Sequence, residues 1–502
     1  MVAALSTAGT IIFAVAKPPI AKFSNVIGRG YTYLLSISFY VLSYIIMASA
    51  KTINTYAAGI VFYNVGQSGT NILNDIVMSD ITTARWRALG LSLLFLPFLV
   101  MPWVGALIVE SVVKPGGIGW RWGIGMLAIL MPFCASFIIV TMLYFERKAK
   151  RMNLIPRVKM TVYRFCSQID LGGVFLFAAG FALFLLPMTL ASTSPSQWQT
   201  PWLIALIIVG GLLLIGLAVY EHFLAAHPIM PAHYFRNLTI VLCCILVTGD
   251  SLGMQCTHTY LYAWATVAHN MNARDATFYF YTNGVTQSLS GIMGGLFMAY
   301  FRRYKHLAIA GAVVRLVGYG VMIRLRGAQN GYAELFIVQL IQGLGSGIIQ
   351  NSLLVPVQVS VPHAEMAQAT ALVVSFSVVG SSIGSCIAGG IYTNTFKSRL
   401  WYHLGDRGSV SLVSHLFNSI TTGVPAWGTP ERTAINFAYT DVMRYMTYTA
   451  VGSTAPAVIL TWLMPNHRLP YVEVHISFQR EVVDADLNDI GIGTTSLSSD
   501  LC

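Results

Sequence analysis

Ionisable and polar side chains occur inside two long apolar stretches of the sequence, residues 238–268 and 277–300. Asp250 and His258 lie eight residues apart in the first stretch, so in a helix they share roughly one face, about two turns from each other. A carboxylate and an imidazole placed in this way can take up and release protons near neutral pH. The spacing therefore predicts a proton-binding site. A hydrogen-bonded pair that only stabilises helix packing is the alternative.

Aromatic and amide side chains accompany this pair along the chain. Tyr260, Tyr262 and Trp264 alternate, so they cannot all share one helical face, and we expect some of them to face lipid or an interfacial aromatic belt. Those that face a cavity would suit a flat or polar organic ligand. The ligand-binding candidates in the two stretches are Tyr260, Tyr262, Trp264, Tyr281, Asn283 and Gln287.

Two arginines also lie inside apolar stretches, Arg315 in 307–325 and Arg444 in 442–465. A buried guanidinium needs a partner, and for Arg315 we expect either Asp250 or an anionic group of a ligand. Gln339 and Gln342 lie in the stretch 334–358, where they can line a polar cavity. Glycines beside them permit close helix contact, and tight packing alone is the alternative.

Charged residues also cluster where apolar stretches end, in the segments AKFSNVIGRG and SDITTARWR. Opposite charges at such places can pair, close one side of a passage and separate during a conformational cycle. The excess of Lys and Arg that cytoplasmic loops carry is the alternative explanation for the arginines. The gate candidates are Lys22, Asn25, Arg29, Asp75, Asp80, Arg85 and Arg87.

The elements that carry these side chains are predicted to be membrane-spanning helices. Hydrophobic residues make up 55% of the 502 residues and charged residues 10%, whereas a soluble protein carries about 25% charged residues. Most of the chain must therefore be solvated by lipid, and its long continuous apolar runs fit helices. The thirteen predicted spans are 1–20, 33–50, 55–78, 88–110, 123–145, 170–191, 201–223, 238–268, 277–300, 307–325, 334–358, 366–392 and 442–465.

Lysine and arginine orient these spans. The alternate loops that begin with 21–32 carry 17 Lys and Arg, and the loops on the opposite side carry 10 when Arg324, at the end of the stretch 307–325, is counted with them. The first set is therefore predicted to be cytoplasmic. Residue 1 then starts outside, and we expect a first helix to be missing before it, with thirteen spans present of fourteen.

The same orientation divides the chain into regions. We expect an N-terminal bundle over 1–145, a basic cytoplasmic loop over 146–169 and the remaining helices over 170–465. Within these helices, 393–441 is predicted to be a long outer loop that can act as a lid, or an ordinary connection. Residues 466–502 form a polar cytoplasmic tail.

Several classes of protein are excluded by what the sequence lacks. No P-loop or HExxH motif is present, and the Gly-x-Ser-x-Gly match at 380–384 lies inside an apolar stretch and not at a strand-to-helix turn, so an enzyme is not expected. No spaced Cys/His cluster predicts a metal centre, and we expect neither a cofactor nor a structural disulfide. The net charge of +11 is explained by cytoplasmic loops facing anionic lipid, so no nucleic-acid partner is expected.

The segment from Ala21 to Arg29 resembles the signature between the second and third helices of major facilitator transporters, with Asn25 where the family usually has Asp. A narrower resemblance covers most of the chain. SDITTARWRALGLSLLFLPF, GWRWGIGML, HTYLYAWATVAHN, VGSSIGSCIAGGIYTNTF and INFAYTDVMRYMTYTA together resemble the fourteen-span fungal siderophore–iron transporters and their paralogues that exchange glutathione for protons.

This resemblance implies an all-α major facilitator fold with two pseudo-symmetric bundles and proton-driven transport of a ferric siderophore or of glutathione. It maps the aromatic residues near the end of the family's last outer loop onto Phe437 and Tyr439. We expect a monomer in the plasma membrane or in an endosomal or vacuolar membrane.

The substrate stays open between two chemistries. A ferric hydroxamate chelate is bulky and weakly charged, so its site should be aromatic and amide-lined. Glutathione would need cations for two carboxylates, which Arg315 and Arg444 can supply. A non-transporting membrane sensor is the alternative from another class.

Overall fold

The computed structural model describes residues 2–113, 118–152, 167–190, 199–225, 228, 231–362, 365–405, 408–418, 424–466 and 468–469. Regular structure in this part of the chain is helical, apart from one isolated bridge between Arg303 and Arg468. The helices up to the basic loop are α1 (Val2–Val15), α2 (Lys17–Ile27), α3 (Arg29–Ser49), α4 (Ile53–Ile81), α5 (Arg87–Leu93), η1 (Leu96–Leu99), α6 (Met101–Val113) and α7 (Trp120–Arg151).

The helices that follow the basic loop are mostly longer. They are α9 (Leu171–Leu190), α10 (Pro201–Phe223), η3 (Ala232–Arg236), α11 (Leu238–His258), α12 (Leu261–Ala268), α13 (Ala273–Phe301), α14 (Lys305–Leu325), α15 (Tyr332–Val359), α16 (Met366–Leu404), α17 (Val410–Asn418) and α18 (Pro430–Leu463).

Seven stretches of the described chain are long and apolar enough to cross a membrane, judged by length and composition alone. They include α3, α7, α10, the run from α11 to α12, α14, α15 and α16. In lipid every backbone N–H and C=O must be satisfied within the segment, which is why such sequences form helices. The count of thirteen spans stays a prediction.

Three predicted spans are interrupted, and the first of them, 1–20, contains α1 and the start of α2. The stretch 88–110 is divided into α5, η1 and α6, with Pro97 inside η1 and Pro102 at the start of α6. Proline lacks a backbone N–H, so it cannot continue an α-helical hydrogen-bond ladder. The stretch 238–268 is divided into α11 and α12, with Thr259 and Tyr260 between them.

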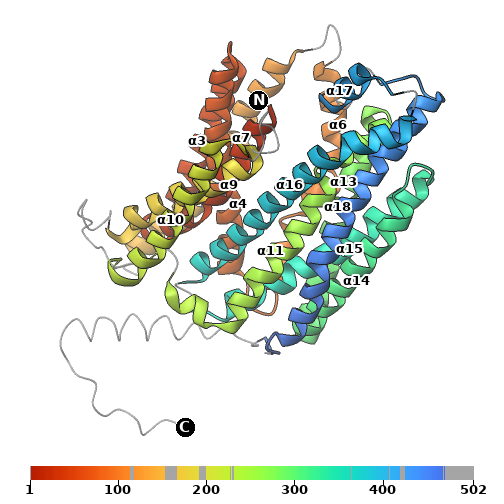
Figure 1. Cartoon of the computed structure of the whole chain (residues 1–502). Coiled ribbons are helices and arrows are strands. Elements are labelled where there is room, and N and C mark those ends of the chain that lie inside the picture. The colour runs from red at the N-terminus through yellow and green to blue at the C-terminus, as the bar shows by residue number, and fades with distance from the viewer. Residues whose placement is uncertain are drawn as a thin grey trace.

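The helices pack in two groups that lie side by side in Figure 1. The first group contains α1, α3, α4, α7, α9 and α10, and the second contains α5, α6, α11, α13, α14, α15, α16 and α18. Membership does not follow chain order, because α5 and α6 pack on α13 while α9 and α10 pack on α1. The groups approach each other near the start of α16 and separate toward α17.

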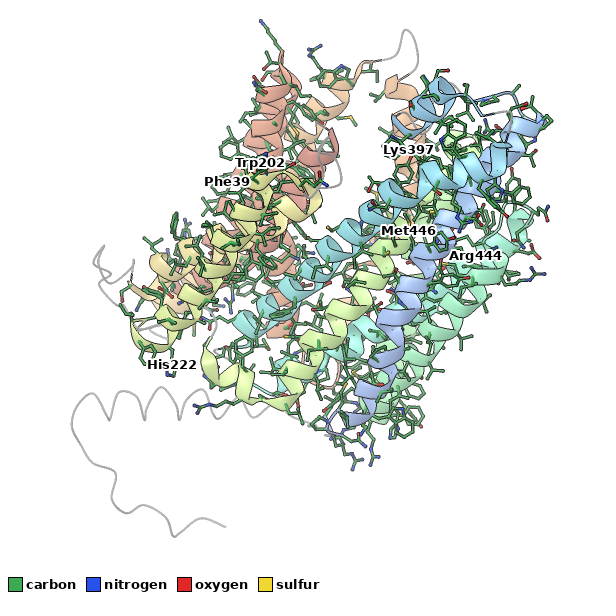
Figure 2. All side chains as sticks on the ribbon, viewed as in Figure 1. Phe39, Trp202, His222, Lys397, Arg444 and Met446 are labelled. Atoms are coloured by element: carbon green, nitrogen blue, oxygen red, sulfur yellow. The ribbon has the colours of Figure 1, made fainter. Side chains whose placement is uncertain are left out.

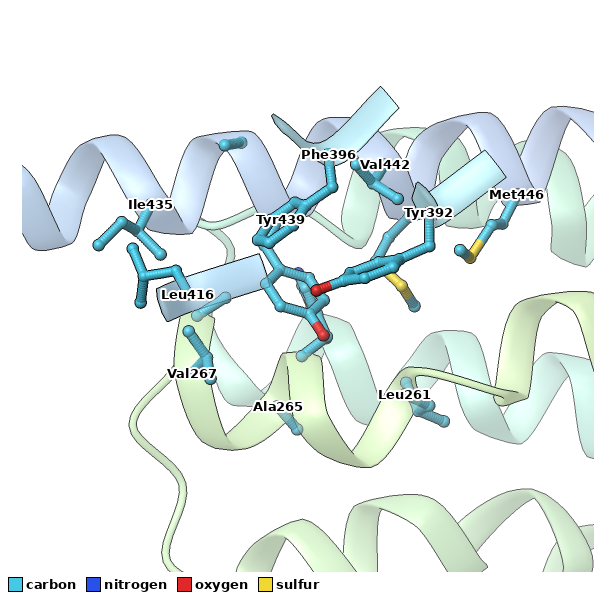
Figure 3. Packing of buried hydrophobic residues seen from close by; sticks show 14 of the residues in the cluster. Leu261, Ala265, Val267, Tyr392, Phe396, Leu416, Ile435, Tyr439, Val442 and Met446 are labelled. Carbon is cyan, nitrogen blue, oxygen red and sulfur yellow. The ribbon is translucent and has the colours of Figure 1, made fainter. Parts of the chain in front are cut away.

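The segment 393–441 is largely helical where it is described. Helix α16 continues to Leu404, α17 is amphipathic and buries Val413 and Leu416, and α18 already begins at Pro430. These elements close one end of the second group with an aromatic core, in which Tyr392, Phe396 and Tyr439 lie against one another (Figure 3). Burial of this apolar surface explains why a polar-looking stretch folds into helices.

Candidate functional site

The buried ion pair of Asp250 and Arg315 joins α11 to α14. Arg315 Nε donates to Asp250 Oδ1 at 2.6 Å, and the arginine side chain is fully buried whereas Asp250 keeps 15% of its side-chain surface exposed. Arg315 Nη1 lies 3.2 Å from both the backbone oxygen and Oε1 of Gln342 on α15. Of the two partners expected for Arg315, the structure therefore gives Asp250.

Small residues bring α14 and α15 close enough for this network. A Cβ added at Gly345 would lie 2.9 Å from the backbone nitrogen of Arg315, and one added at Gly318 would lie 2.8 Å from Gln342 Nε2. Gly345 faces backbone, so glycine is required there, whereas a side chain at Gly318 would have to displace the end of the Gln342 side chain. The sequence allowed either tight packing or a polar cavity for Gln342, and here the packing is tight.

His258 does not join Asp250 through any contact among the described residues. Its Nδ1 bonds to the backbone oxygen of Met254 at 2.9 Å within α11, and its Nε2, although buried, has no hydrogen-bond partner in the described chain. Both amide atoms of Gln339 and of Asn283 are buried without a hydrogen bond of good geometry, but the Gln339 side chain lies within interaction range of His258 and Tyr279. Asn283 thus leaves its amide atoms available inside the second group.

Arg326 is a functional candidate that the sequence did not single out. It follows the last turn of α14 and lies just beyond the predicted span 307–325, yet only 4% of it is exposed. Its Nη2 donates to the backbone oxygen of Thr257 at 2.8 Å, close to the end of α11, where the helix dipole is negative. The signal available in the sequence was an arginine directly adjoining an apolar stretch.

The aromatic side chains that were predicted to bind a ligand lie partly in a packed core and partly at the surface. Trp264 is fully buried and donates from Nε1 to Thr440 Oγ1 at 3.2 Å, while Tyr260 stacks on Tyr392 with a centroid distance of 4.7 Å. Tyr439 is 1% exposed in the same core. Tyr262 and Tyr281 are about 40% exposed, as expected for aromatics that face lipid or an interface.

Phe437 and Arg444 lie on α18 away from the ion pair. Phe437 stacks on His403 with a centroid distance of 6.0 Å, and His403 is paired with Asp441 at 2.9 Å. Arg444 is exposed, on the margin of the second group remote from the first (Figure 2). Arg315 and Arg444 therefore do not converge on one site in this structure.

A cavity of about 130 Å³ lies where α5 and η1 meet α13 and α15. Gln287 Nε2 on α13 donates to Gln350 Oε1 on α15 at 2.7 Å, and both glutamines line the cavity. Asn351 Nδ2 donates to Ser92 Oγ at 2.5 Å, which fixes α15 to α5. Among the predicted candidates, Gln287 is the residue that the structure places at this cavity.

The gate candidates lie near the predicted cytoplasmic ends of α2, α3, α4 and α5. Arg29 Nε pairs with Asp80 Oδ2 at 3.1 Å, and Arg29 Nη1 donates to Asn25 Oδ1 at 2.5 Å. Asn25 is uncharged, and it still accepts a hydrogen bond from Arg29. Lys22, Asp75 and Arg87 are buried, with exposed fractions below 9%.

Uncharged contacts and one arginine connect the two helix groups at this end. Gln358 Nε2 on α15 donates to Ser79 Oγ on α4 at 3.0 Å. Arg85 Nε donates to the backbone oxygen of Ala299 at 2.8 Å, in the last turn of α13, where a cation is favoured by the helix dipole. These contacts hold the two groups together at the predicted cytoplasmic end.

No group of three or more His, Cys, Asp or Glu side chains that could hold a metal ion occurs in the described part of the chain. The cysteines described there, Cys134, Cys243, Cys244, Cys256 and Cys386, form no disulfide bond. Cys166 and Cys502 lie outside the described residues.

Comparison with known families and curated proteins gives consistent matches. The model of the family described as "Fungal trichothecene efflux pump (TRI12)" matches residues 2–426. Siderophore iron transporter 1 of Schizosaccharomyces pombe is 32% identical, over 96% of this chain and 78% of the relative. Siderophore transporter fer7 of Mycosarcoma maydis is 31% identical, over 93% and 74%.

A further relative is named for a different substrate. The low affinity heme transporter str3 of Schizosaccharomyces pombe is 30% identical, over 92% of this chain and 75% of the relative. Among solved structures, the major facilitator proton:xylose symporter XylE matches with a TM-score of 0.51 and 14% identity, over 92% of this chain and 86% of that one. This last likeness concerns the fold alone.

Proposed function

Because this chain belongs to the fungal siderophore–iron transporter family of the major facilitator superfamily, we propose that it moves a siderophore–iron chelate across a membrane by proton-coupled alternating access. It is a multi-pass integral membrane protein of a transporter family and not an enzyme. Thirteen spans in two pseudo-symmetric bundles are the architecture that we propose for the transport cycle.

The Asp250–Arg315 pair is the observation that carries the proton-coupling part of the proposal. A carboxylate inside a bilayer protein is a functional candidate by default, and this one is partly exposed while its partner is sealed. Protonation of Asp250 would remove the counter-charge of Arg315 and leave Gln342 as its remaining partner. Such a change can shift α14 and α15 relative to α11, which is the kind of step that couples a proton to a helix movement.

The distribution of charge supports a bulky, weakly charged substrate over glutathione. Arg315 is already neutralised by Asp250, and Arg444 is exposed on a different surface, so the two cations do not form a dicarboxylate site. The cavity beside α5 is lined by amides, hydroxyls and phenylalanine rings. This is the lining expected for a neutral chelate.

Uptake into sealed vesicles containing the purified chain tests the proposal. A neutral ferric tris-hydroxamate chelate labelled with radioactive iron should accumulate, and an imposed pH gradient should accelerate its entry. Labelled glutathione and heme are the matched competing substrates. Accumulation of glutathione or heme without any ferric chelate would overturn the assignment of substrate, and chelate binding without flux would favour a sensor.

The membrane in which the chain works is part of the same proposal. We propose the plasma membrane or an endosomal or vacuolar membrane, in which the predicted outer ends of α16 and α18 face the compartment that supplies the chelate. Fractionation of cells that express a tagged chain, read together with the uptake assay, distinguishes the three.

A further inference from the structure

The helix interruption between α5 and α6 lies against the 130 Å³ cavity. Residues Leu94–Val100 contain the short helix η1 and depart from α-helical geometry in the middle of a predicted span. Lipid cannot satisfy the backbone groups that such a break leaves free, so non-helical backbone at this depth is tolerated where protein or a polar cavity covers it. Here Ser92, Phe95 and Phe98 form one wall of the cavity.

The opposite walls come from α13 and α15 and carry no charge. Gln287 and Ser288 lie on α13, and Gln350 and Asn351 lie on α15. Gly347 has no room for a side chain, because its Cβ would lie 2.2 Å from the backbone oxygen of Gln287. The close packing of the two helices therefore holds their amide groups at the cavity.

The amides differ in how fully their hydrogen-bonding capacity is used. Asn351 Nδ2 is committed to Ser92 Oγ and to the backbone oxygen of Gly291, at 2.5 and 3.0 Å, and so ties the three walls together. Gln287 and Gln350 share a single hydrogen bond, from Nε2 to Oε1. An amide carries two donors and an acceptor, so this pair still offers the Gln287 oxygen and the Gln350 nitrogen.

The cavity is smaller than a whole chelate. Pockets that bury a drug-sized ligand have volumes of about 300–1,000 Å³, so a cavity of about 130 Å³ takes only part of such a ligand. The site therefore suits the edge of a larger ligand whose remainder lies outside the cavity.

From these features we infer that the Gln287–Gln350 pair and the α5–η1 interruption form a specificity subsite, which binds one uncharged amide-type group of the transported ligand. This inference rests on the proposed function and adds to it the residues that read the ligand. The Gln287 oxygen accepts the N–H of the ligand, and the Gln350 nitrogen donates to its carbonyl oxygen. A charged group is disfavoured, because none of the lining residues can neutralise it.

A glycine pair in the chain provides a matched steric test. A Cβ added at Gly284 would sit in ordinary contact with Phe98, 3.8 Å from its Cδ1, so alanine fits there and occupies the cavity. A Cβ added at Gly320 on α14 would meet no atom within 4 Å. In vesicles, Gly284→Ala should raise the KM for the labelled ferric tris-hydroxamate chelate roughly threefold to tenfold, and Gly320→Ala should leave the KM unchanged.

A chemical test compares two ferric tris-hydroxamate chelates. The parent chelate carries secondary amides beside its hydroxamates, and in the other chelate these amide nitrogens are methylated. Loss of one uncharged hydrogen bond should raise the KM of Gln287→Leu for the parent chelate roughly threefold to tenfold, with Vmax kept. The methylated chelate should show the higher KM with the wild-type chain and no further rise with Gln287→Leu. A general packing defect would instead lower Vmax for both ligands.

The outcomes separate this subsite from the function on which it rests. Equal KM values for Gly284→Ala, Gln287→Leu and the wild-type chain, with chelate uptake intact, would overturn the subsite and leave the proposed function standing. Failure of the wild-type chain to take up any ferric chelate would overturn both.

Discussion

Two arginine–aspartate pairs occupy contrasting environments in this protein. Arg315 and Asp250 lie inside the second helix group with side-chain exposures of 0% and 15%, and their N–O distance is 2.6 Å. Arg29 and Asp80 lie at the predicted cytoplasmic end of the first group with exposures of 27% and 23%, and their N–O distance is 3.1 Å. The chemistry is the same, so the difference in burial decides what each pair can do.

Removing one partner has different consequences in the two places. A buried charge left without its partner destabilises a protein by about 3–5 kcal/mol, whereas an exposed pair contributes about 0–1 kcal/mol. Neither pair connects the two helix groups. The Asp250–Arg315 pair is therefore suited to a change of protonation that acts within one helix group. The Arg29–Asp80 pair is suited to a small adjustment of the stability of the predicted cytoplasmic end.

The largest expected effect follows from neutralising the buried carboxylate. Asp250→Asn should abolish uptake driven by a pH gradient, because the asparagine cannot change charge when the pH changes. Initial rates in vesicles with and without the gradient measure this effect, and immunodetection at the cell surface measures the amount of protein. Normal gradient-driven uptake by this variant would remove Asp250 from the mechanism.

The control for this prediction removes both charges. Asp250→Asn combined with Arg315→Gln leaves no unpaired charge, so the double variant should unfold at a higher temperature than Asp250→Asn alone. Gradient-driven uptake should stay absent in the double variant. Its recovery would show that the loss in the single variant came from misfolding.

An intermediate effect is expected at the partly exposed Arg29–Asp80 pair. Arg29→Gln should lower the free energy of unfolding by less than about 1 kcal/mol and change the maximal uptake rate by no more than a few-fold. Thermal unfolding in detergent and saturation kinetics provide the two measurements. A loss as large as that of Asp250→Asn would contradict the division of roles between the pairs.

A smaller effect is expected when a charge is added beside Arg29. Asn25→Asp converts a neutral hydrogen bond into an ion pair at the predicted cytoplasmic end, which should stabilise that end by about 0.2–1 kcal/mol. The maximal uptake rate should fall about twofold while KM stays constant. The difference should shrink at high salt because the pair is exposed. A salt-independent effect would point to a change in packing.

The smallest effect is expected in the aromatic core of the second group. The Tyr439 hydroxyl is buried without a hydrogen-bond partner in the described chain, so Tyr439→Phe should leave the melting temperature unchanged or slightly raised. Uptake kinetics should also stay unchanged. Tyr439→Ala is the control for packing and should destabilise by about 3–5 kcal/mol. A raised KM for Tyr439→Phe would indicate that the Tyr439 hydroxyl contacts the ligand.

Part of the candidate site was accessible from the sequence because it depends on composition. An aspartate, an arginine and several amides within apolar stretches must be paired or functional, and this reasoning gave the single residues Asp250, Arg315, Gln342 and Gln287 as candidates. The same reasoning missed Arg326, because it lies just beyond an apolar stretch. Trp264, predicted from the sequence, and Tyr439, implied by the family resemblance, both lie in a packed core.

The sequence by itself determined that these helices are solvated by lipid, and its motifs indicated the family, because composition and local motifs do not depend on neighbours in space. Only the tertiary structure decided that Asp250 pairs with Arg315 while His258 points elsewhere, and that α5 and α6 pack on α13. The physical reason is that apolar side chains pack equally well against lipid and against another helix. Helical periodicity in such a chain therefore gives the spacing of polar groups but leaves open which partner each of them meets.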